Sequence, residues 1–328
     1  MDFDKLFQQF LTIKAGVIGD VMLDTYWWGH VERISPEAPV PVVALDKREV
    51  RIGGAGNVAL NLVSLGAKTS IFSVIGNDDP GKELNQMLAD SGINTSYIIS
   101  NPARKTTNKT RVISRNQQMM RLDSETTDDL NTEAEDALIG RVRDYIVAEK
   151  PAIIIFEDYN KGVLTARVIS EVLALCSKHG IITSVDPKRK NFFAYRNATI
   201  FKPNLKEVKD GLNLLVDEVT LPTLAHIHQL LREQLQHNIS LITLSEKGVF
   251  WQERETGEII PSHIRNIADV SGAGDTVIAV ASLAYAAAKD TGVMAGIANI
   301  AGGLVCEEVG TMAINKERLL QECKLLMK

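Results

Sequence analysis

The chain has 328 residues, of which 45% are hydrophobic and 23% are charged, a composition typical of a soluble globular protein. Its formal net charge of −5 argues against broad nucleic-acid binding, and its longest apolar stretch, within residues 277–288, is too short to span a membrane. The 3 cysteines are too widely spaced for a disulfide framework or a zinc site, and the acidic N-terminus lacks a signal-peptide pattern, so we expect a cytoplasmic protein.

Short apolar runs alternate with helical patterns along most of the chain. We expect strands at 16–19, 69–75, 152–156, 181–185, 199–202 and 241–244, and helices at 56–65, 81–91, 132–149, 165–179, 204–215, 222–236, 274–288, 292–308 and 316–327. Continuous apolar strands between helices indicate an α/β fold with a mostly parallel sheet covered on both faces. Ligands of such sheets bind beyond the carboxyl ends of the strands, so we expect the site in the loops at that edge.

Two stretches interrupt the alternation and predict a small β lid. Residues 31–51 carry prolines around β-type runs, and much of 98–124 has the alternating character of extended chain. No linker, repeat or low-complexity segment separates these stretches from the rest. We therefore expect a single domain over residues 1–328, with lid insertions at about 31–51 and 98–124.

The second lid stretch is strongly basic, with six basic residues and no acidic residue between positions 104 and 121. Side chains alternate along a strand, so Lys109, Arg111 and Arg115 would project from one face. Such a row could bind a phosphorylated sugar, since arginine binds phosphate through two hydrogen bonds. Alternatively, the charges protect an exposed strand edge from aggregation.

Polar residues and glycines gather where predicted strands end and helices begin. Asp20 ends the first strand and Asp24 would lie one helical turn further; both could accept hydrogen bonds from sugar hydroxyls, or act as turn or cap residues. The glycines within residues 51–57 let a ligand approach the backbone, or simply start a helix. Residues 16–20 lack the third glycine of the dinucleotide-binding fingerprint.

Three further polar segments, 157–162, 186–188 and 203–207, each follow an apolar run. In the last of them, Asn204 and Glu207 are three residues apart at a helix start and could hold a water-coordinated Mg²⁺. The same pair could equally form a capping box, with Asn204 as the N-cap and Glu207 at N3.

Residues 269–276 join a glycine loop to a helix rich in small residues, with Asp275 in its first turn. Glycines bring backbone N–H groups close to a ligand, and a helix N-terminus favours anions, above all phosphate. A carboxylate beside such an anion site can orient and deprotonate an attacking hydroxyl, as phosphoryl transfer requires. Asp275 is therefore the candidate catalytic base, although acidic residues are common in first helical turns for dipole reasons alone.

Two glycine motifs carry a resemblance to a known family. Gly53-Gly54-Ala55-Gly56-Asn57 and Gly272-Ala273-Gly274-Asp275 resemble, in this order, the two signatures of the ribokinase-like (PfkB) sugar kinases. The alternation of strands and helices between them matches across essentially the whole chain. The resemblance implies a ribokinase-like three-layer α/β/α domain with a small β lid, and ATP with Mg²⁺ as cofactors.

Further motifs resemble one branch of that family, the D-glycero-β-D-manno-heptose-7-phosphate kinases of the ADP-heptose pathway, which supplies lipopolysaccharide core heptose. They are Gly19-Asp20-Val21-Met22-Leu23-Asp24, Tyr26-Trp27, the run Arg33–Val42, Ser114-Arg115-Asn116-Gln117-Gln118 and Arg121-Leu122-Asp123. In many bacteria this kinase is fused to an adenylyltransferase. Residues 226–229 do not fit the H-x-G-H signature of such a transferase, so the resemblance implies a kinase that works with a separate adenylyltransferase.

The resemblance also implies roles for individual residues. Asp275 would be the base, and Gly272, Ala273 and Gly274 would form the anion hole. Substrate contacts would come from Asp20, Arg33, Gly53, Gly54, Asn57, Lys109, Arg111, Arg121 and Asp158, and nucleotide contacts from Asn204, Glu207, Lys161, Lys188, Ser271 and Asn299, with Glu207 reaching Mg²⁺ through water. Ser271 stands where related chains commonly have threonine, and Glu157 receives no role.

The activity implied is ATP-dependent phosphorylation of the anomeric hydroxyl of heptose 7-phosphate to the 1,7-bisphosphate. The alternatives are another sugar or phosphosugar kinase, such as a fructokinase or phosphofructokinase, and a non-catalytic sugar or nucleotide sensor. The partners expected are the sugar phosphate and ATP, with neither nucleic acid nor membrane. The β-rich lid edges suggest a homodimer, and a monovalent cation such as K⁺ is a trait of the family.

Overall fold

The computed structural model describes residues 1–115, 117–216, 218–263 and 265–327; Asn116, part of one motif above, lies outside this set. Its main sheet consists of β1 (Lys14–Gly19), β4 (Lys68–Gly76), β5 (Ile98–Asn101), β8 (Ile153–Glu157), β9 (Ile182–Asp186), β10 (Ile200–Phe201), β11 (Ile239–Thr243), β12 (Val249–Glu253) and β13 (Thr256–Ile260). Within the described residues these nine strands are ordered β13-β12-β11-β10-β9-β8-β1-β4-β5. Pairing is parallel from β5 to β11, and antiparallel in β11–β12–β13. The predicted α/β fold is confirmed.

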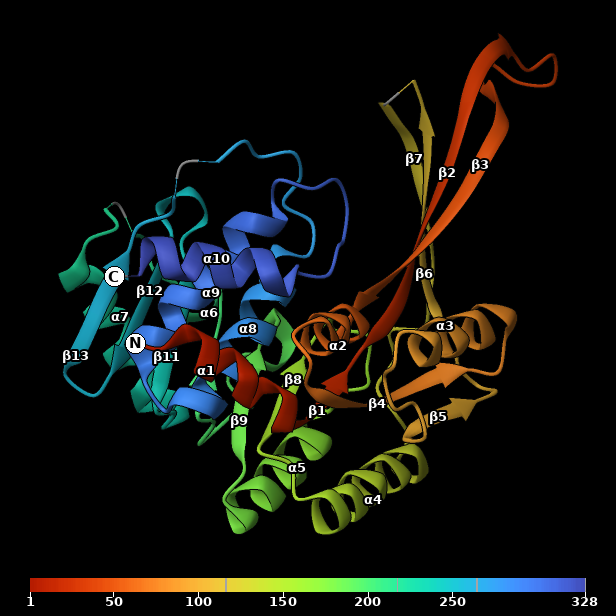
Figure 1. Ribbon diagram of the computed structural model, residues 1–328. Helices are drawn as coiled ribbons and strands as arrows, with labels where there is room; N and C mark the ends of the chain where they lie inside the picture. Colours follow the sequence, from red (N-terminus) through yellow and green to blue (C-terminus); the bar gives the residue numbers. More distant parts are fainter. Residues whose placement is uncertain (116, 217, 264, 328) are drawn as a thin grey trace.

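Helices cover both faces of this sheet (Figure 1). They are α1 (Phe3–Gln9), α2 (Ala55–Ser64), α3 (Asp79–Asp90), α4 (Thr132–Glu149), α5 (Ala166–His179), α6 (Leu205–Leu212), α7 (Leu221–Leu235), α8 (Ala273–Ala288), α9 (Thr291–Val305) and α10 (Lys316–Leu326). Alternate strand residues enter two separate cores: Val17 packs with α1, α2, α8 and α9, whereas Ile18 packs with α4, α5 and α7. Alternation along each strand therefore fills both layers at once.

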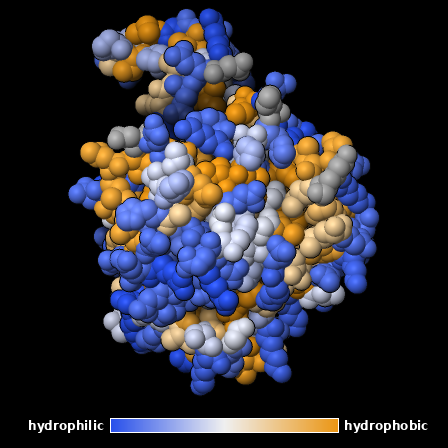
Figure 2. All heavy atoms as spheres, turned by 90° about the vertical axis from the view of Figure 1, so that its left-hand side faces the viewer, coloured by the Kyte–Doolittle hydropathy of each residue, from blue (hydrophilic) through white to orange (hydrophobic). Residues whose placement is uncertain are grey.

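The lid is a four-stranded sheet of β2 (Val21–Ile34), β3 (Pro41–Gly54), β6 (Thr107–Ser114) and β7 (Gln117–Ser124), ordered β3-β2-β6-β7. Its strands project from the body as a narrow extension (Figures 1 and 2). The lid differs from the expected bounds, because β2 begins directly after β1 and β5 belongs to the main sheet. Asp24 thus lies on a strand and not one helical turn beyond Asp20, since β2 pairs with both β3 and β6 there.

The predicted strands and helices occur within a few residues of their expected ends, whereas α1, β5, β12 and β13 were not predicted. Across the described ranges, no helix combines the length and the apolar character that crossing a membrane requires. The topology brings the ends of β1, β8 and β9, the start of α8 and the base of the lid to one edge of the main sheet. The candidate site lies there.

Candidate active site at the start of helix α8

Gly272 provides the turn that starts α8. It is the N-cap residue, with φ of +77°, and a Cβ atom there would lie 2.7 Å from Nδ2 of Asn57. An L-residue with a side chain would be strained at this φ and would crowd Asn57, so the loop requires glycine. The backbone N–H groups of the first turn have no partner within the helix, which makes this end suitable for an anion.

Asp275, in the first turn of α8, is held by two side chains from distant parts of the chain. Its Oδ2 accepts a hydrogen bond from Asn57 Nδ2 at 2.8 Å, and its Oδ1 accepts one from the Tyr159 hydroxyl at 2.8 Å. Asn57 belongs to α2, so the two glycine motifs of the sequence meet at this carboxylate. Burial raises the pKa of Asp275 to about 6, against the two hydrogen bonds that lower it. A carboxyl with this pKa is suited to accept a proton near neutral pH.

Two more carboxylates lie beside Asp275, at the ends of neighbouring strands. Glu157 ends β8 and Asp186 ends β9, and the two residues are register partners. Carboxylate oxygens of Glu157, Asp186 and Asp275 all lie within 4.8 Å of one another. Asp186 pairs with the buried Lys202, whose Nζ lies 2.7 Å from Oδ2.

Lys188 and Lys202 form ion pairs with Asp186, whereas no ion pair with Glu157 occurs among the described residues. Burial would raise the pKa of Asp186, but Lys188 and Lys202 outweigh it and hold that pKa below its ordinary value. Burial raises the pKa of Glu157 well above its ordinary value, and the charges of Asp186 and Asp275 add to the rise. Neither side-chain oxygen of Glu157 has a hydrogen-bond partner within the described residues, although the residue is completely buried.

Asn204 and Glu207 form the capping box of α6. Asn204 Oδ1 accepts from the Glu207 N–H, and Glu207 Oε2 accepts from the Asn204 N–H, both at 2.8 Å. The other oxygen of Glu207 accepts from Lys188 Nζ at 2.9 Å. Both carboxylate oxygens of Glu207 therefore accept hydrogen bonds from protein groups.

Asp20 and Asp158 are buried and fasten the loop after β8. Asp20 accepts hydrogen bonds from the backbone N–H groups of Tyr159, Lys161 and Val163, at 2.9 to 3.1 Å. Burial raises the pKa of Asp20 to about 6, and the charge of Asp158 contributes to the rise. The Asp158 carboxylate accepts from the Asn160 N–H and from the side chains of Asn191 and Tyr195. Both carboxylates thus hold the backbone that presents Tyr159.

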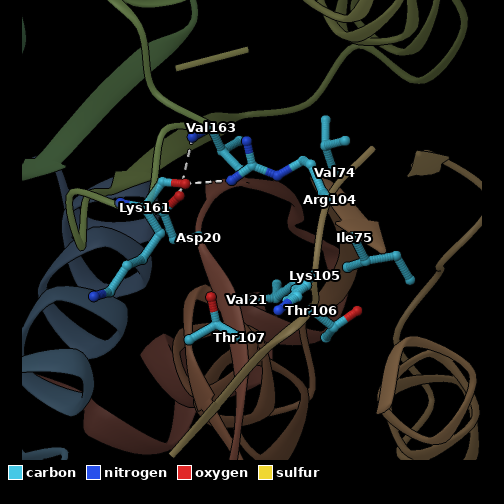
Figure 3. A pocket seen from close by; sticks show the side chains of 10 residues that line it. All are labelled: Asp20, Val21, Val74, Ile75, Arg104, Lys105, Thr106, Thr107, Lys161 and Val163. Atoms are coloured by element: carbon cyan, nitrogen blue, oxygen red, sulfur yellow. Dashed lines mark hydrogen bonds between the residues drawn. The ribbon is translucent and has the colours of Figure 1, made fainter. Parts of the chain in front are cut away.

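A small cavity lies beside Asp20, where Arg104 donates to the carbonyl of Lys161 (Figure 3). Its volume of about 10 Å³ leaves room for roughly one water molecule. Neither Asp275 nor α8 lines it. The residues around the cavity anchor the loop after β8, and the cavity is too small to hold a sugar.

The base of the lid turns cations and a carboxylate towards the site. Lys109 and Arg111 occupy alternate positions of β6 and share a face; Lys109 Nζ lies 5.4 Å from the centre of the Tyr159 ring. Arg111 pairs with Asp24 on β2, at 2.6 Å. A Cβ atom at Gly53 would lie 2.3 Å from Asp24 Oδ2, so this glycine leaves room for the carboxylate.

The other lid cations lie further out. Arg121 on β7 is the register partner of Arg111 and pairs with Asp123 at 2.9 Å. Arg33 is exposed at the far end of β2. Arg115, expected on the face of Lys109, has a φ of +48° in the turn between β6 and β7. Gly54, at the base of β3, has a φ of +60°, and a Cβ there would lie 2.3 Å from the Asp20 carbonyl oxygen.

Three remaining candidates contact protein groups near the site. Lys161 pairs with Glu125 at 2.7 Å. Ser271 donates its hydroxyl proton to Asp269 at 2.8 Å, and Asn299 on α9 donates to the Pro261 carbonyl at 2.8 Å.

The chain matches the family model described as pfkB family carbohydrate kinase over residues 13–318. It belongs to the pfkB family of carbohydrate kinases. It is 40% identical over 98% of its length to the bifunctional protein HldE of Geotalea uraniireducens, of which it covers 65%, and 37% identical over 92% of its length to that of Campylobacter curvus, of which it covers 63%. The chain thus spans less than two thirds of these curated relatives.

Solved structures of other proteins share the fold. The phosphofructokinase-2 from Escherichia coli in complex with potassium gives a TM-score of 0.80 at 17% identity, covering 96% of this chain and 100% of that one. The Arabidopsis thaliana ribokinase complexed with ribose and ATP gives a TM-score of 0.73 at 16% identity, covering 94% and 99%.

Sequence reasoning assigned no role to several residues of this pfkB-family site. Tyr159 and Asp186 follow predicted strands, and that position was the available signal. The sequence contained no signal for Lys202, because a lysine at the end of a short strand is normally expected at the surface. Only the structure shows that it is buried against Asp186. Asp24 was noted, but its contact with Arg111 depends on the pairing of β2 with β6.

Proposed function

We propose that this chain is an ATP-dependent kinase that phosphorylates the anomeric C1 hydroxyl of D-glycero-β-D-manno-heptose 7-phosphate, giving the 1,7-bisphosphate. The observation that carries the proposal is Asp275, a buried carboxylate with a raised pKa at the N-terminus of α8. Membership of the pfkB family supports the carbohydrate kinase class. The identity with proteins named bifunctional protein HldE, together with the branch motifs, supports the heptose substrate.

In the proposed reaction, Asp275 accepts the proton of the C1 hydroxyl as the sugar oxygen bonds to the γ-phosphorus. The bond from that phosphorus to the bridging oxygen breaks, and ADP leaves. The N–H groups of residues 272–274 would stabilise the charge on the transferring group. Asn57 orients the carboxylate through its 2.8 Å hydrogen bond.

Lid residues are the proposed readers of the sugar phosphate. Lys109 and Arg111 share one face of β6 next to Tyr159, so a phosphate there would meet two cations. Arg121 is adjacent on β7. Asp24 and Asn57, with Gly53 and Gly54, are placed for sugar hydroxyls. Asp20 and Asp158 instead serve the loop, and Arg33 at the far end of β2 would require the lid to close.

ATP would be bound together with Mg²⁺, as the family implies. The hard oxygen donors of this site fit Mg²⁺, which would offset the negative charge of the phosphates. Asn204, Glu207, Lys161, Lys188, Ser271 and Asn299 stay predicted nucleotide-side residues. The monovalent cation, the homodimer and the separate adenylyltransferase also stay predictions.

A coupled ADP-release assay tests the function, with heptose 7-phosphate, fructose 6-phosphate, fructose and ribose compared at equal concentrations. We expect turnover with heptose 7-phosphate far above the others. Preference for fructose 6-phosphate would replace the substrate and keep the kinase, whereas ligand binding without ADP release would favour a sensor. Asp275→Asn should lower kcat by roughly 10²–10⁴-fold, the range for loss of a general base. Near-normal turnover in that variant would refute the role of Asp275.

A further inference from the structure

Arg51 is a lid residue whose side chain contacts a loop outside the lid. It lies on β3, and its side chain is 21% exposed. Its Nη1 donates to the Val309 carbonyl at 2.6 Å, and its Nε donates to Glu49 Oε1 at 2.8 Å. Val309 belongs to the segment of residues 306–315 between α9 and α10, here called the α9–α10 loop. The contact between Arg51 and Val309 spans 258 positions of the chain and joins the lid to this loop.

The α9–α10 loop has a glycine where the guanidinium reaches it. Gly310 has a φ of +74°, and a Cβ atom there would lie 2.0 Å from Nη1 of Arg51. A residue with a side chain would be strained at this φ and would displace the guanidinium. The position of Arg51 against the loop therefore depends on glycine at position 310.

The same loop lies against the turn that begins α8. The Gly310 N–H donates to Asp269 Oδ2 at 2.9 Å, and the other oxygen of Asp269 accepts from the Ser271 N–H at 3.0 Å. The next loop residue, Thr311, packs on Gly272, since a Cβ at Gly272 would lie 3.1 Å from Thr311 Cγ2. The loop thus supports the turn whose N–H groups form the proposed anion hole.

On the lid side, Arg51 lies beside the proposed readers of the sugar phosphate. It is the register partner of Asp24, which pairs with Arg111 at 2.6 Å. The guanidinium groups of Arg51 and Arg111 lie 5.4 and 5.2 Å from the centre of the Tyr26 ring. Contacts that start at Arg111 therefore continue through Tyr26 and Arg51 to Val309 of the α9–α10 loop.

We propose that Arg51 is a positioning residue for the phosphoryl transfer. From β3 it holds the α9–α10 loop against the turn at Gly272, so that the N–H groups of residues 272–274 keep the geometry that the transferring group requires. The proposal rests on the proposed function for its effect on turnover, whereas the contact itself is testable without any substrate. A direct contact between Arg51 and the sugar phosphate is the competing role, and it would change substrate affinity instead of turnover.

The contact is tested by hydrogen exchange of the ligand-free full chain, measured by mass spectrometry over residues 306–315. Arg51→Met removes the donors and keeps the apolar stem, so exchange in this segment should become about 10–100-fold faster, the range for loss of a charged hydrogen bond. Arg48→Met is the matched control, because Arg48 lies on the same strand but pairs with Glu83 on α3 at 2.8 Å. This control should leave exchange of residues 306–315 within about threefold of the wild type.

The positioning role is tested by steady-state kinetics of the same variants. Arg51→Met should lower kcat about 10–100-fold, as displacement of a reacting group does, with KM for the sugar phosphate within about threefold. Arg51→Lys keeps one donor for the Val309 carbonyl and should recover most of the lost kcat. Arg48→Met should retain the wild-type kcat and KM.

Three results would overturn the proposal. A rise in KM with kcat unchanged would make Arg51 a phosphate ligand, and wild-type kcat in Arg51→Met would remove its role in turnover. A kcat in Arg51→Lys as low as in Arg51→Met would exclude the hydrogen bond to Val309 as the cause. Failure of the proposed function is distinguishable: no phosphosugar would then be turned over by the wild type, while faster exchange in Arg51→Met would still establish the contact.

Discussion

Two buried histidines should make the stability of this protein fall steeply in mild acid. His228 on α7 and His237 just after it share one hydroxyl: Ser240 Oγ on β11 lies 2.9 Å from His228 Nδ1 and 2.7 Å from His237 Nε2. A hydroxyl donates a single proton, so this chain of hydrogen bonds requires one imidazole to accept. Protonation of the accepting imidazole would break the chain inside the core.

The expected magnitude follows from the two pKa values. Burial and the charge of Arg232 lower the pKa of His228 to about 4, and burial, His228 and Arg232 together lower that of His237 to about 3. Folding thus favours the neutral form of each histidine. The contribution of the two histidines to the free energy of unfolding is therefore complete above about pH 6.5, the pKa of histidine in the unfolded chain, and is lost as the pH falls below it. At pH 5 the unfolded chain has bound both protons and the folded chain neither, which costs about 2 kcal/mol for each histidine, or about 4 kcal/mol together.

The measurement is urea unfolding followed by tryptophan fluorescence between pH 7.5 and 5. The control is the double variant His228→Asn/His237→Gln, whose amides can replace Nδ1 and Nε2 as partners of Ser240 but cannot ionise. We expect the wild type to lose about 4 kcal/mol more than the variant over this range. If the free energies of unfolding of the two proteins fall in parallel with pH, within about 1 kcal/mol, the reasoning is refuted. Carboxyl groups common to both proteins would then account for the whole pH dependence.

Three further substitutions test the site. In steady-state kinetics, Arg111→Ala should raise KM for the sugar phosphate about 10–100-fold, as expected for loss of a charged hydrogen bond, with KM for ATP little changed. Equal effects on both KM values would show that the lid does not bind the sugar phosphate. Gly272→Ala should lower the free energy of unfolding, measured by urea denaturation, by about 1–3 kcal/mol, because φ is +77° there. Gly140→Ala is the control: Gly140 lies in α4, where a Cβ meets nothing within 4 Å, so this variant should be neutral or stabilising in the same measurement. Lys202→Met should cost about 3–5 kcal/mol by leaving Asp186 buried without its 2.7 Å partner, and adding Asp186→Asn should recover part of that loss; a single variant of normal stability would contradict the pairing.

The sequence predicted the main sheet well, because its strands are continuous apolar runs between helices with the period of 3.6 residues. It also predicted that Asp275 starts a helix after a glycine turn. The lid was located less well, since only Asp20 separates β2 from β1, and the prolines around the β-type runs of residues 31–51 marked only its outer part. The antiparallel pair β12–β13 lacks helices on its connections and was missed.

The hydrogen-bond partners of the site residues were the hardest feature to predict from the sequence. Asp20 could be named as a polar residue at a strand end, but its acceptance of three backbone N–H groups depends on how residues 159–163 fold back over it. The capping box of Asn204 and Glu207 was visible in the spacing, and it is present. The contact between Asn57 and Asp275 joins positions 218 residues apart, and only the shared family motif pointed to it.

If Asp275 is the base of the proposed reaction, the acceptor hydroxyl must first displace the Tyr159 hydroxyl from it. The Tyr159 hydroxyl already donates to Asp275, and Lys109 and Lys188 lie 5.4 and 5.3 Å from the centre of its ring. A sugar hydroxyl that takes over Oδ1 releases the phenol, so the net gain is the difference between two hydrogen bonds and not the value of one. Under the proposed function, a water molecule would meet the same competition without a phosphate that contacts the lysines, so Asp275 would be protected from water more effectively than from the sugar phosphate.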